Sequence, residues 1–316
     1  MRIAMIGSGA AGSVFACYLK NGGAEMTLVD RYRVHMDKCA SEGVRFVTPE
    51  GEELLQGFHT ASSAEEIGVM DIVILMVKAT QTESLIPSLL PCIGEKTSIV
   101  SLQNGLGNDE LLSRYFPADR ILYGFGTIGT ELPEPGKCVS KPEEGVIMRF
   151  GAVEDSPISR SAGKYLEACF RRGGCPTVFE KDIRPFVWKK AISNSGYNTL
   201  SALLRLKVGD LLETEEGLAL VWSVWEEGCA VCEAMTGINL RPELAEELPR
   251  LKKGFANYYP SMAQDVLRYQ RQTEISVLNG AIARFGALCG VPTPINTALS
   301  QMIGCIQGNY DRLYIA

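Results

Sequence analysis

A glycine-rich turn directly after the first predicted strand constrains this chain more than any other feature. Residues 2–6 are nearly all apolar, as expected of a parallel strand buried on both faces, and a turn with glycines at 7, 9 and 12 follows at once. A helical pattern then stops at the Asn-Gly-Gly of residues 21–23, and a second strand is predicted at 26–29. This order and spacing are typical of a βαβ unit that binds a dinucleotide. The predicted phosphate-binding residues are Gly7, Ser8, Gly9, Ala10, Ala11 and Gly12.

Asp30 ends the second predicted strand, where such a unit places the acid that accepts a hydrogen bond from the ribose 2'-hydroxyl. A carboxylate there favours NAD(H), because it would repel the 2'-phosphate of NADP(H). Arg31 and Arg33 favour NADP(H), since guanidinium groups bind phosphate, although a solvated surface position explains at least one of them. The residues leave the cofactor choice open.

Strands and helices alternate up to about residue 180, which predicts an α/β fold with a doubly wound parallel sheet. Beyond that point strand signals vanish, and helices are predicted at 184–198, 215–236, 242–253, 261–285 and 296–307. A length of 316 residues favours two domains. We expect a dinucleotide-binding domain at 1–181 and a helical substrate and catalytic domain at 182–316.

Two predicted strands end in polar residues, at the edge where a doubly wound sheet binds its ligands. Lys78 follows the strand at 71–77, and Gln103 and Asn104 follow the strand at 97–102. A lysine after a strand is often only solvated, but two such ends beside a cofactor motif favour a functional role.

Lys190, Asn194 and Asn198 are spaced i, i+4 and i+8, so they share one helix face. Asparagine forms helices poorly, because its side chain competes for backbone partners. One interpretation is that this face binds a polar substrate, with the lysine ammonium group as the acid. The alternative is that it is a polar face exposed to solvent. Lysine suits keto acid reduction, since it attracts the substrate carboxylate and can protonate the developing alkoxide. Ser261 is predicted either to cap the last long helix or to contact the substrate, and Glu274 lies on the apolar part of that helix.

Composition narrows the function classes. The net charge of −6 and the lack of a basic cluster disfavour nucleic acid, and the chain lacks an apolar run of the roughly 20 residues that a membrane span needs. Ten scattered cysteines are typical of reduced thiols in a cytoplasmic protein, with Cys229 and Cys232 as core thiols. The only histidines are His35 and His59, which disfavours a metal site or a histidine triad.

Taken together, these clusters resemble the ketopantoate reductase family over nearly the whole chain. The resemblance rests on the glycine turn, Val77-Lys78-Ala79, Gln103-Asn104-Gly105, Trp188-Lys189-Lys190 with Asn194 and Asn198, Ser261-Met262, Thr273-Glu274 and Asn279-Gly280. It implies a Rossmann-type domain followed by an all-helical domain, and NADPH-dependent reduction of ketopantoate to pantoate for coenzyme A synthesis.

The resemblance also implies residue roles. Lys190 corresponds to the catalytic lysine, and Asn194, Asn198 and Ser261 correspond to substrate-binding residues. Lys78, Asn104 and Glu274 correspond to residues around the nicotinamide end of the cofactor, and Asn104 is also expected to contact the substrate.

Two departures from the family pattern keep alternatives open. NADPH enzymes of the family typically lack an acid at the position of Asp30, and NAD-dependent D-2-hydroxyacid dehydrogenases resemble the same family. The spacing from Ser261 to Glu274 is one residue longer than the pattern. A non-catalytic nicotinamide sensor is the alternative of another class. The sequence leaves the oligomeric state open, a homodimer included.

Overall fold

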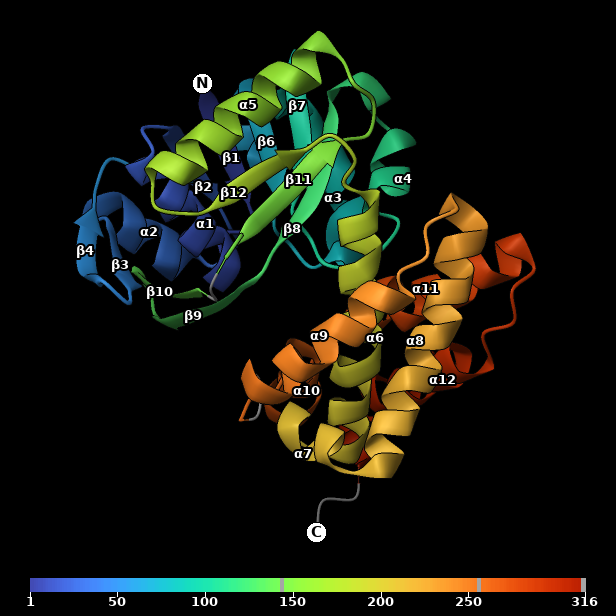
Figure 1. Ribbon diagram of the computed structural model, residues 1–316. Coiled ribbons are helices and arrows are strands. Elements are labelled where there is room, and N and C mark those ends of the chain that lie inside the picture. The colour runs from blue at the N-terminus through green and yellow to red at the C-terminus, as the bar shows by residue number, and fades with distance from the viewer. Residues whose placement is uncertain (143–144, 255–256, 314–316) are drawn as a thin grey trace. The chain divides into compact units, whose positions relative to one another are not determined.

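The computed structural model describes residues 1–142, 145–254 and 257–313, and it divides the chain into two compact units. The first consists of Met1–Gln103 and Asn108–Ile183, and the second of Asn104–Gly107 and Arg184–Ala316. Figure 1 shows the helices and strands of both units. The first unit has two hydrophobic core clusters and the second has one of its own. A short segment, residues 104–107, therefore leaves the sheet of the first unit to pack with the helices of the second.

An eight-stranded sheet forms the centre of the first unit. Its strands, in spatial order, are β12 (Thr177–Glu180), β11 (Met148–Ala152), β8 (Ile121–Gly126), β7 (Ile93–Ser101), β6 (Met70–Leu75), β1 (Arg2–Ile6), β2 (Glu25–Val29) and β5 (His59–Ala61). Its helices are α1 (Ala10–Asn21), α2 (Arg33–Ser41), α3 (Thr82–Leu89), α4 (Asn108–Ser113) and α5 (Pro157–Arg172). All neighbouring strands are parallel except β8 and β11. The predicted doubly wound fold is confirmed, with one antiparallel addition.

Alternation along β1 explains why both faces of this sheet are covered. Ile3 and Met5 belong to the core that α1 and α5 share, whereas Ala4 and Ile6 belong to the core that α3 covers. Successive side chains of a strand point to opposite faces, so a strand buried on both sides must be apolar throughout.

A second sheet of four strands was not predicted. It consists of β4 (Gly51–Leu55), β3 (Val44–Thr48), β10 (Lys137–Pro142) and β9 (Ile128–Glu134), in that order. β4 is mostly exposed and β9 has no fully buried residue, so neither strand shows much of the hydrophobic periodicity by which a strand is recognised. The small sheet packs against α1 through buried residues such as Phe46 and Cys138.

The second unit is helical. Its helices are α6 (Arg184–Leu204), α7 (Val208–Glu213), α8 (Glu215–Thr236), α9 (Arg241–Gly254), α10 (Ser261–Gln264), α11 (Asn279–Cys289) and α12 (Pro294–Gln307). α6 packs against α7, α8, α9, α10 and α12, and residues 191–202 are buried without interruption. A helix buried on all sides is usually apolar, yet this stretch contains Ser193, Asn194, Asn198 and Thr199. Cys229 and Cys232 are buried in the same core, as predicted.

The prediction of one continuous helix over residues 261–285 is wrong. α10 passes into a π-helical turn at Asp265–Tyr269, and Gln270 then takes a left-handed backbone conformation with φ of 47°. Glu274 consequently lies ahead of a short 3-10 turn (Ile275–Val277), not on an apolar helix. The apolar residues on both sides of the break have helical spacing, so periodicity alone did not reveal it. Among the described residues, no helix is long and apolar enough to cross a membrane.

His35 on α2 is fully buried and contacts Ser13 of α1 and Gly136, which lies between β9 and β10. Its Nδ1 accepts a hydrogen bond from the backbone N–H of Gly136 at 2.9 Å, and its Nε2 lies 3.0 Å from Ser13 Oγ. A backbone N–H can only donate, so Nδ1 carries no proton and the ring is neutral with its proton on Nε2. Burial lowers the pKa of His35 below its ordinary value of 6.5, an effect partly offset by the nearby charge of Asp30.

This burial predicts a stability that falls in mild acid. The unfolded chain binds a proton at His35 more readily than the folded chain, so the stabilisation is complete above pH 6.5 and is lost as the pH falls toward the lower folded pKa. We expect His35→Asn to lower the free energy of urea unfolding at pH 7.5 and to flatten its decline between pH 7 and 5.5. Circular dichroism is the suitable probe, because all three tryptophans lie in the second unit. His59→Gln, at an exposed position of β5, is the control, and an equal pH slope in wild type and His35→Asn would refute the assignment.

Candidate functional site

The glycine turn holds α1 close to β1. Gly7 has φ of 94°, and a Cβ at Gly12 would lie 2.0 Å from the Gly7 carbonyl oxygen, so a larger residue there requires the backbone to move. Around Gly9, by contrast, an added Cβ would meet nothing within 4 Å. The outer side of the turn is therefore open at the N-terminus of α1.

The first turn of α1 lacks the groups that usually satisfy a helix N-terminus. Its N-cap is Gly9, which has no side chain, and no acidic residue lies in the first turn. The N–H groups of Ala10, Ala11 and Gly12 precede the first i to i−4 hydrogen bond, which runs from Ser13 N to Gly9 O at 2.9 Å. Such a terminus is an anion site, and its open face fits the pyrophosphate of a dinucleotide. Ser8 differs from its neighbours, because its Oγ points inward to Met5 O and Val29 N.

Asp30 lies directly after β2, where its Oδ1 accepts a hydrogen bond from Tyr32 N at 2.9 Å. This contact orients the carboxylate at the end of the strand through one of its two oxygens. No ion pair joins Asp30 to Arg31 or Arg33 among the described residues, and both arginines are exposed. Neither arginine therefore pairs with the acid at the position predicted to meet the ribose.

Lys78 also lies in the first unit, half-buried just after β6. Gln103 holds Val77, the residue before Lys78. Its Nε2 donates to Val77 O at 2.7 Å and to Thr82 Oγ1 at 2.8 Å. Gln103 thus ties the end of β6 to the end of β7, which is a structural role.

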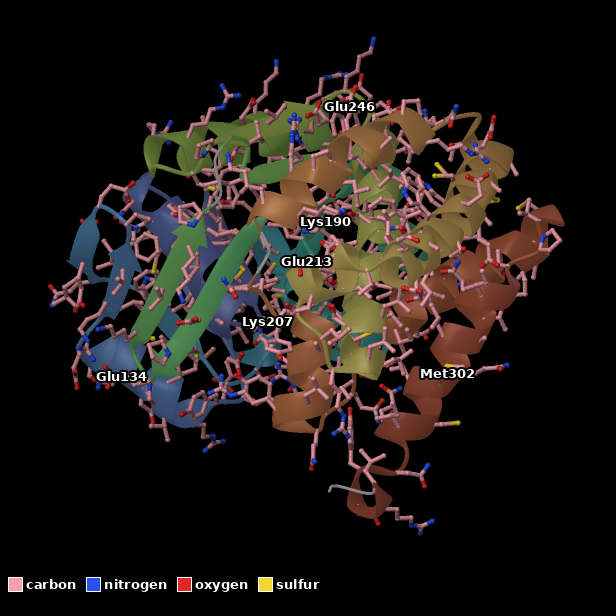
Figure 2. All side chains as sticks on the ribbon, turned by 60° about the horizontal axis from the view of Figure 1, so that its bottom comes forward. Glu134, Lys190, Lys207, Glu213, Glu246 and Met302 are labelled. Atoms are coloured by element: carbon pink, nitrogen blue, oxygen red, sulfur yellow. The ribbon has the colours of Figure 1, made fainter. Side chains whose placement is uncertain are left out.

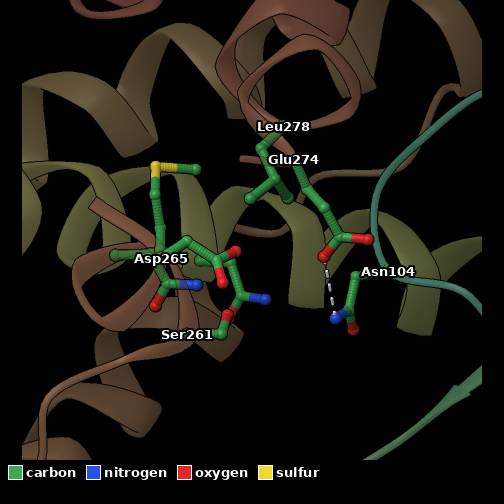
Figure 3. A pocket seen from close by; sticks show the side chains of 8 residues that line it. Asn104, Ser261, Asp265, Glu274 and Leu278 are labelled. Carbon is green, nitrogen blue, oxygen red and sulfur yellow. Dashed lines mark hydrogen bonds between the residues drawn. The ribbon is translucent and has the colours of Figure 1, made fainter. Parts of the chain in front are cut away.

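A polar pocket lies within the second unit (Figure 3). Its lining residues are Asn104, Asn194, Asn198, Ser261, Met262, Asp265, Glu274 and Leu278. Five of the six second-unit residues predicted for the site are therefore brought together, although they come from three separate segments. The sixth, Lys190, is half-buried on α6 one turn before Asn194 (Figure 2).

The two asparagines of α6 present different groups to this pocket. Asn194 Oδ1 accepts a hydrogen bond from Tyr197 OH at 2.7 Å, which leaves the NH2 group of Asn194 as a donor. Asn198 Oδ1 is buried and has no hydrogen-bond partner in the part of the chain that the structure describes. Both residues are less than one-tenth exposed, so the alternative of a solvated polar face does not hold. A buried acceptor without a protein partner is costly unless a ligand or a bound water supplies a donor.

Asn104 and Glu274 form the other side of the pocket in Figure 3. Asn104 Nδ2 donates to Glu274 Oε2 at 3.3 Å. Backbone contacts hold the two segments together, since Leu106 N donates to Val277 O at 2.8 Å and Gly105, with φ of 94°, leaves no room for a side chain against Val277.

Ser261 opens α10, but its side chain makes no N-cap hydrogen bond, because the N-cap position is Pro260. A π-helical turn lies between Ser261 and Glu274, and in it Gln270 N donates to Asp265 O five residues back. Both Ser261 and Glu274 line the pocket.

Asp265 is a pocket residue that the sequence analysis did not select. Its side chain is 1% exposed and accepts a hydrogen bond from Arg271 Nε at 2.6 Å. Asp265 lies four residues after Ser261, and this spacing places both side chains on one face of a helical turn. The spacing could therefore have indicated Asp265 as a site residue. Asn279, by contrast, is structural: it connects Thr199 to Asn296 by hydrogen bonds of 2.6 and 3.0 Å inside the core.

Lys189 shows how differently two adjacent lysines are used. Its Nζ pairs with Glu247 at 2.9 Å, and Ser193 donates to the other oxygen of that carboxylate at 2.6 Å. Lys189 is thus fixed on the face of α6 turned to α9, whereas Lys190 shares the face of Asn194 and Asn198. Among the described residues, no group of three or more His, Cys, Asp or Glu side chains is placed to hold a metal ion.

Comparison with known proteins agrees with both units. Residues 3–153 match the family model described as ketopantoate reductase PanE/ApbA, and residues 182–307 match that of its C-terminal domain. A 2-dehydropantoate 2-reductase of Aquifex aeolicus is 30% identical over 316 residues, covering 96% of each chain.

Solved structures show the same two-unit chain. That of 2-dehydropantoate 2-reductase from Geobacter metallireducens is 27% identical, with a TM-score of 0.87 over 96% of this chain and 99% of that one. A D-mandelate dehydrogenase solved with NADH and anilino(oxo)acetate is 26% identical, with a TM-score of 0.86 over 98% of this chain and 99% of that one. The matches cover the glycine turn, the α6 lysine and every segment of the polar pocket, and the chain belongs to the ketopantoate reductase family.

Proposed function

We propose that this chain reduces a hydroxylated, branched 2-keto acid to the 2-hydroxy acid, with a nicotinamide cofactor as hydride donor and Lys190 as proton donor. Ketopantoate is the substrate that fits best, and its product, pantoate, is a precursor of coenzyme A. The observation that carries the proposal is the polar pocket of the second unit, in which Asn194 and Asn198 continue the helix face of Lys190.

The glycine turn and the N-terminus of α1 would hold the nicotinamide cofactor, and the chemistry that it would supply when bound is hydride transfer to the C2 carbonyl carbon. The carbonyl oxygen gains negative charge and takes a proton from Lys190 Nζ, which later regains one from water. The same ammonium attracts the substrate carboxylate, and the NH2 group of Asn194 can donate to a carboxylate or carbonyl oxygen. Asn104 and Glu274 line the same pocket as Asn194, which supports a role for both near the substrate.

Removing the Lys190 ammonium should slow the chemical step. We expect Lys190→Ala to lower kcat by about 10²- to 10⁴-fold, the usual contribution of a general acid, while the protein stays folded. Lys189→Ala is the matched control, because the neighbouring lysine is held by Glu247 and should leave kcat within about threefold of wild type. Steady-state kinetics on one keto acid measures both, and an unchanged kcat in Lys190→Ala would remove this lysine from the mechanism.

The hydrogen-bonding groups of the pocket indicate a hydroxyl on the substrate. The carbonyl and carboxylate of a 2-keto acid only accept hydrogen bonds, so they cannot satisfy Asn198 Oδ1. A further hydroxyl group can, and ketopantoate carries one. Only Met262 and Leu278 among the lining residues are apolar, which makes the pocket a poor match for the phenyl ring of an aromatic keto acid.

A matched pair of substrates tests this assignment. Trimethylpyruvate is ketopantoate without the hydroxyl group, and losing one buried hydrogen bond should lower kcat/KM by roughly 10- to 100-fold. In Asn198→Ala we expect KM for ketopantoate to rise and the ratio between the two substrates to shrink toward one. Equal kcat/KM values for both substrates in the wild-type protein would contradict the hydroxyl contact.

A NAD-dependent D-2-hydroxyacid dehydrogenase is the alternative within the same family, and the similarity to D-mandelate dehydrogenase supports it. It would be favoured by faster turnover of phenylglyoxylate than of ketopantoate. A non-catalytic sensor would bind the cofactor but turn over neither keto acid.

Asp30 governs the choice of cofactor in this proposal. NADP(H) would place a phosphate beside this carboxylate, and no ion pair with Arg31 or Arg33 neutralises it among the described residues. We expect NADH to be used at least as well as NADPH, and Asp30→Ala to shift the preference toward NADPH. The measurement is kcat/KM for both cofactors on one keto acid, with Asp37→Ala on the exposed face of α2 as control. A strong NADPH preference in the wild-type protein would overturn this expectation.

A further inference from the structure

His35 and Ser13 are buried polar residues that the proposed reaction does not use. Both are fully buried, and they lie 3.0 Å apart, between Nε2 and Oγ. Ser13 belongs to the second turn of α1, which follows the glycine turn, whereas His35 belongs to α2. Polar groups placed so deeply in an apolar core need a physical reason.

The hydrogen bonds that link Gly136, His35 and Ser13 to the Ser8 carbonyl have directions that follow from their donors. Gly136 N–H donates to His35 Nδ1 at 2.9 Å, which leaves the ring proton on Nε2. Nε2–H therefore donates to Ser13 Oγ, and the single hydroxyl proton of Ser13 is free to donate to the Ser8 carbonyl oxygen at 2.8 Å. The chain of donors runs from Gly136 in the small sheet to the glycine turn. Cys39 Sγ lies 3.6 Å from Nδ1, which is already occupied by the stronger donor.

The last acceptor of this chain belongs to the peptide between Ser8 and Gly9. The described residues contain no cis peptide bond, and in a planar trans peptide the C=O and the following N–H point in opposite directions. Because the Ser8 carbonyl points inward to Ser13, the N–H of Gly9 points outward, on the side where Gly9 faces open space. That is the face on which a pyrophosphate would lie at the N-terminus of α1.

We propose that His35 is a positioning residue for cofactor binding: acting through Ser13, it holds the Ser8–Gly9 peptide so that Gly9 N–H faces the cofactor pyrophosphate. The proposal rests on the nicotinamide cofactor proposed above. His35 does not touch the cofactor. It supplies one donor, from Nε2, that orients the Ser13 hydroxyl, and it depends on Gly136 for the tautomer that makes this donation.

Two conservative replacements separate this role from a merely structural one. In His35→Gln, the side-chain NH2 of the glutamine reaches the place of the imidazole Nε2 and keeps the donation to Ser13, but the acceptor for Gly136 is lost. In His35→Asn, the side-chain oxygen of the asparagine takes the place of Nδ1 and keeps that acceptor, but the donation to Ser13 is lost. If His35 acts on the glycine turn, His35→Gln should bind the cofactor well and His35→Asn should bind it poorly. If His35 only anchors the small sheet through Gly136, His35→Asn should bind the cofactor better than His35→Gln.

The experiment measures Kd for NADH and NADPH by cofactor fluorescence, with the melting temperature of each unliganded variant. We expect Kd to rise about 3- to 10-fold in His35→Asn and in Ser13→Ala, the usual effect of one hydrogen bond, and less than twofold in His35→Gln and in the His59→Gln control. The double variant His35→Asn/Ser13→Ala should bind no more weakly than the weaker single variant, because both changes break the same chain. kcat at saturating cofactor should stay within about twofold of wild type.

Three outcomes would overturn the proposed role of His35. Unchanged Kd values in folded Ser13→Ala and His35→Asn would overturn this inference and leave the proposed function standing. Weaker binding in His35→Gln than in His35→Asn would overturn it in favour of a structural anchor. If the unmodified protein binds neither NADH nor NADPH, the proposed function fails, and this inference fails with it. Should His35→Asn not fold, Ser13→Ala alone tests the same link, because it removes only one hydroxyl group.

Discussion

The close packing of the first turn of α1 on β1 is the constraint on which the first unit depends. It exists because residue 12 has no side chain: a Cβ there would lie 2.0 Å from the Gly7 carbonyl oxygen. Packed so closely, α1 directs its first N–H groups past the carboxyl edge of β1 and brings Ser13 under the turn, within reach of the Ser8 carbonyl. The open anion site outside the turn and the buried hydrogen-bond chain inside it are two consequences of the same contact.

The second unit is organised by a different requirement, that of satisfying polar groups inside a buried helix. Along α6, Ser195 donates to a carbonyl of its own helix and Thr199 is connected through Asn279 to Asn296. These groups have their partners within the protein, so they stabilise the core without forming a site. Asn198 Oδ1 and Ser201 Oγ differ, since no described residue supplies a hydrogen-bond partner for either of them. Of these two residues, only Asn198 lines the polar pocket.

The π-helical turn after α10 lies between two residues that line the polar pocket, Ser261 and Glu274. Asp265 holds this turn in two ways, since its carbonyl accepts from Gln270 N and its carboxylate accepts from Arg271 Nε. The turn thereby ends helical geometry at Gln270 and brings Glu274 back toward Asn104. Single-turn π segments occur frequently at functional sites, where a local change in helix register can be kept without disturbing the flanking packing.

The sequence by itself determined the features that depend on local physics: the strand, turn and helix around Gly7–Gly12, the acid at Asp30, and the shared face of Lys190, Asn194 and Asn198. Each follows from backbone conformation or from helical spacing over a few residues. Only the tertiary structure decided that Asp265 lines the pocket, that Asn279 is structural, that helix 261–285 is broken, and that a second sheet covers α1. The chain of donors from Gly136 through His35 to Ser8 spans more than a hundred residues, and no local pattern encodes a hydrogen bond between segments so far apart in sequence.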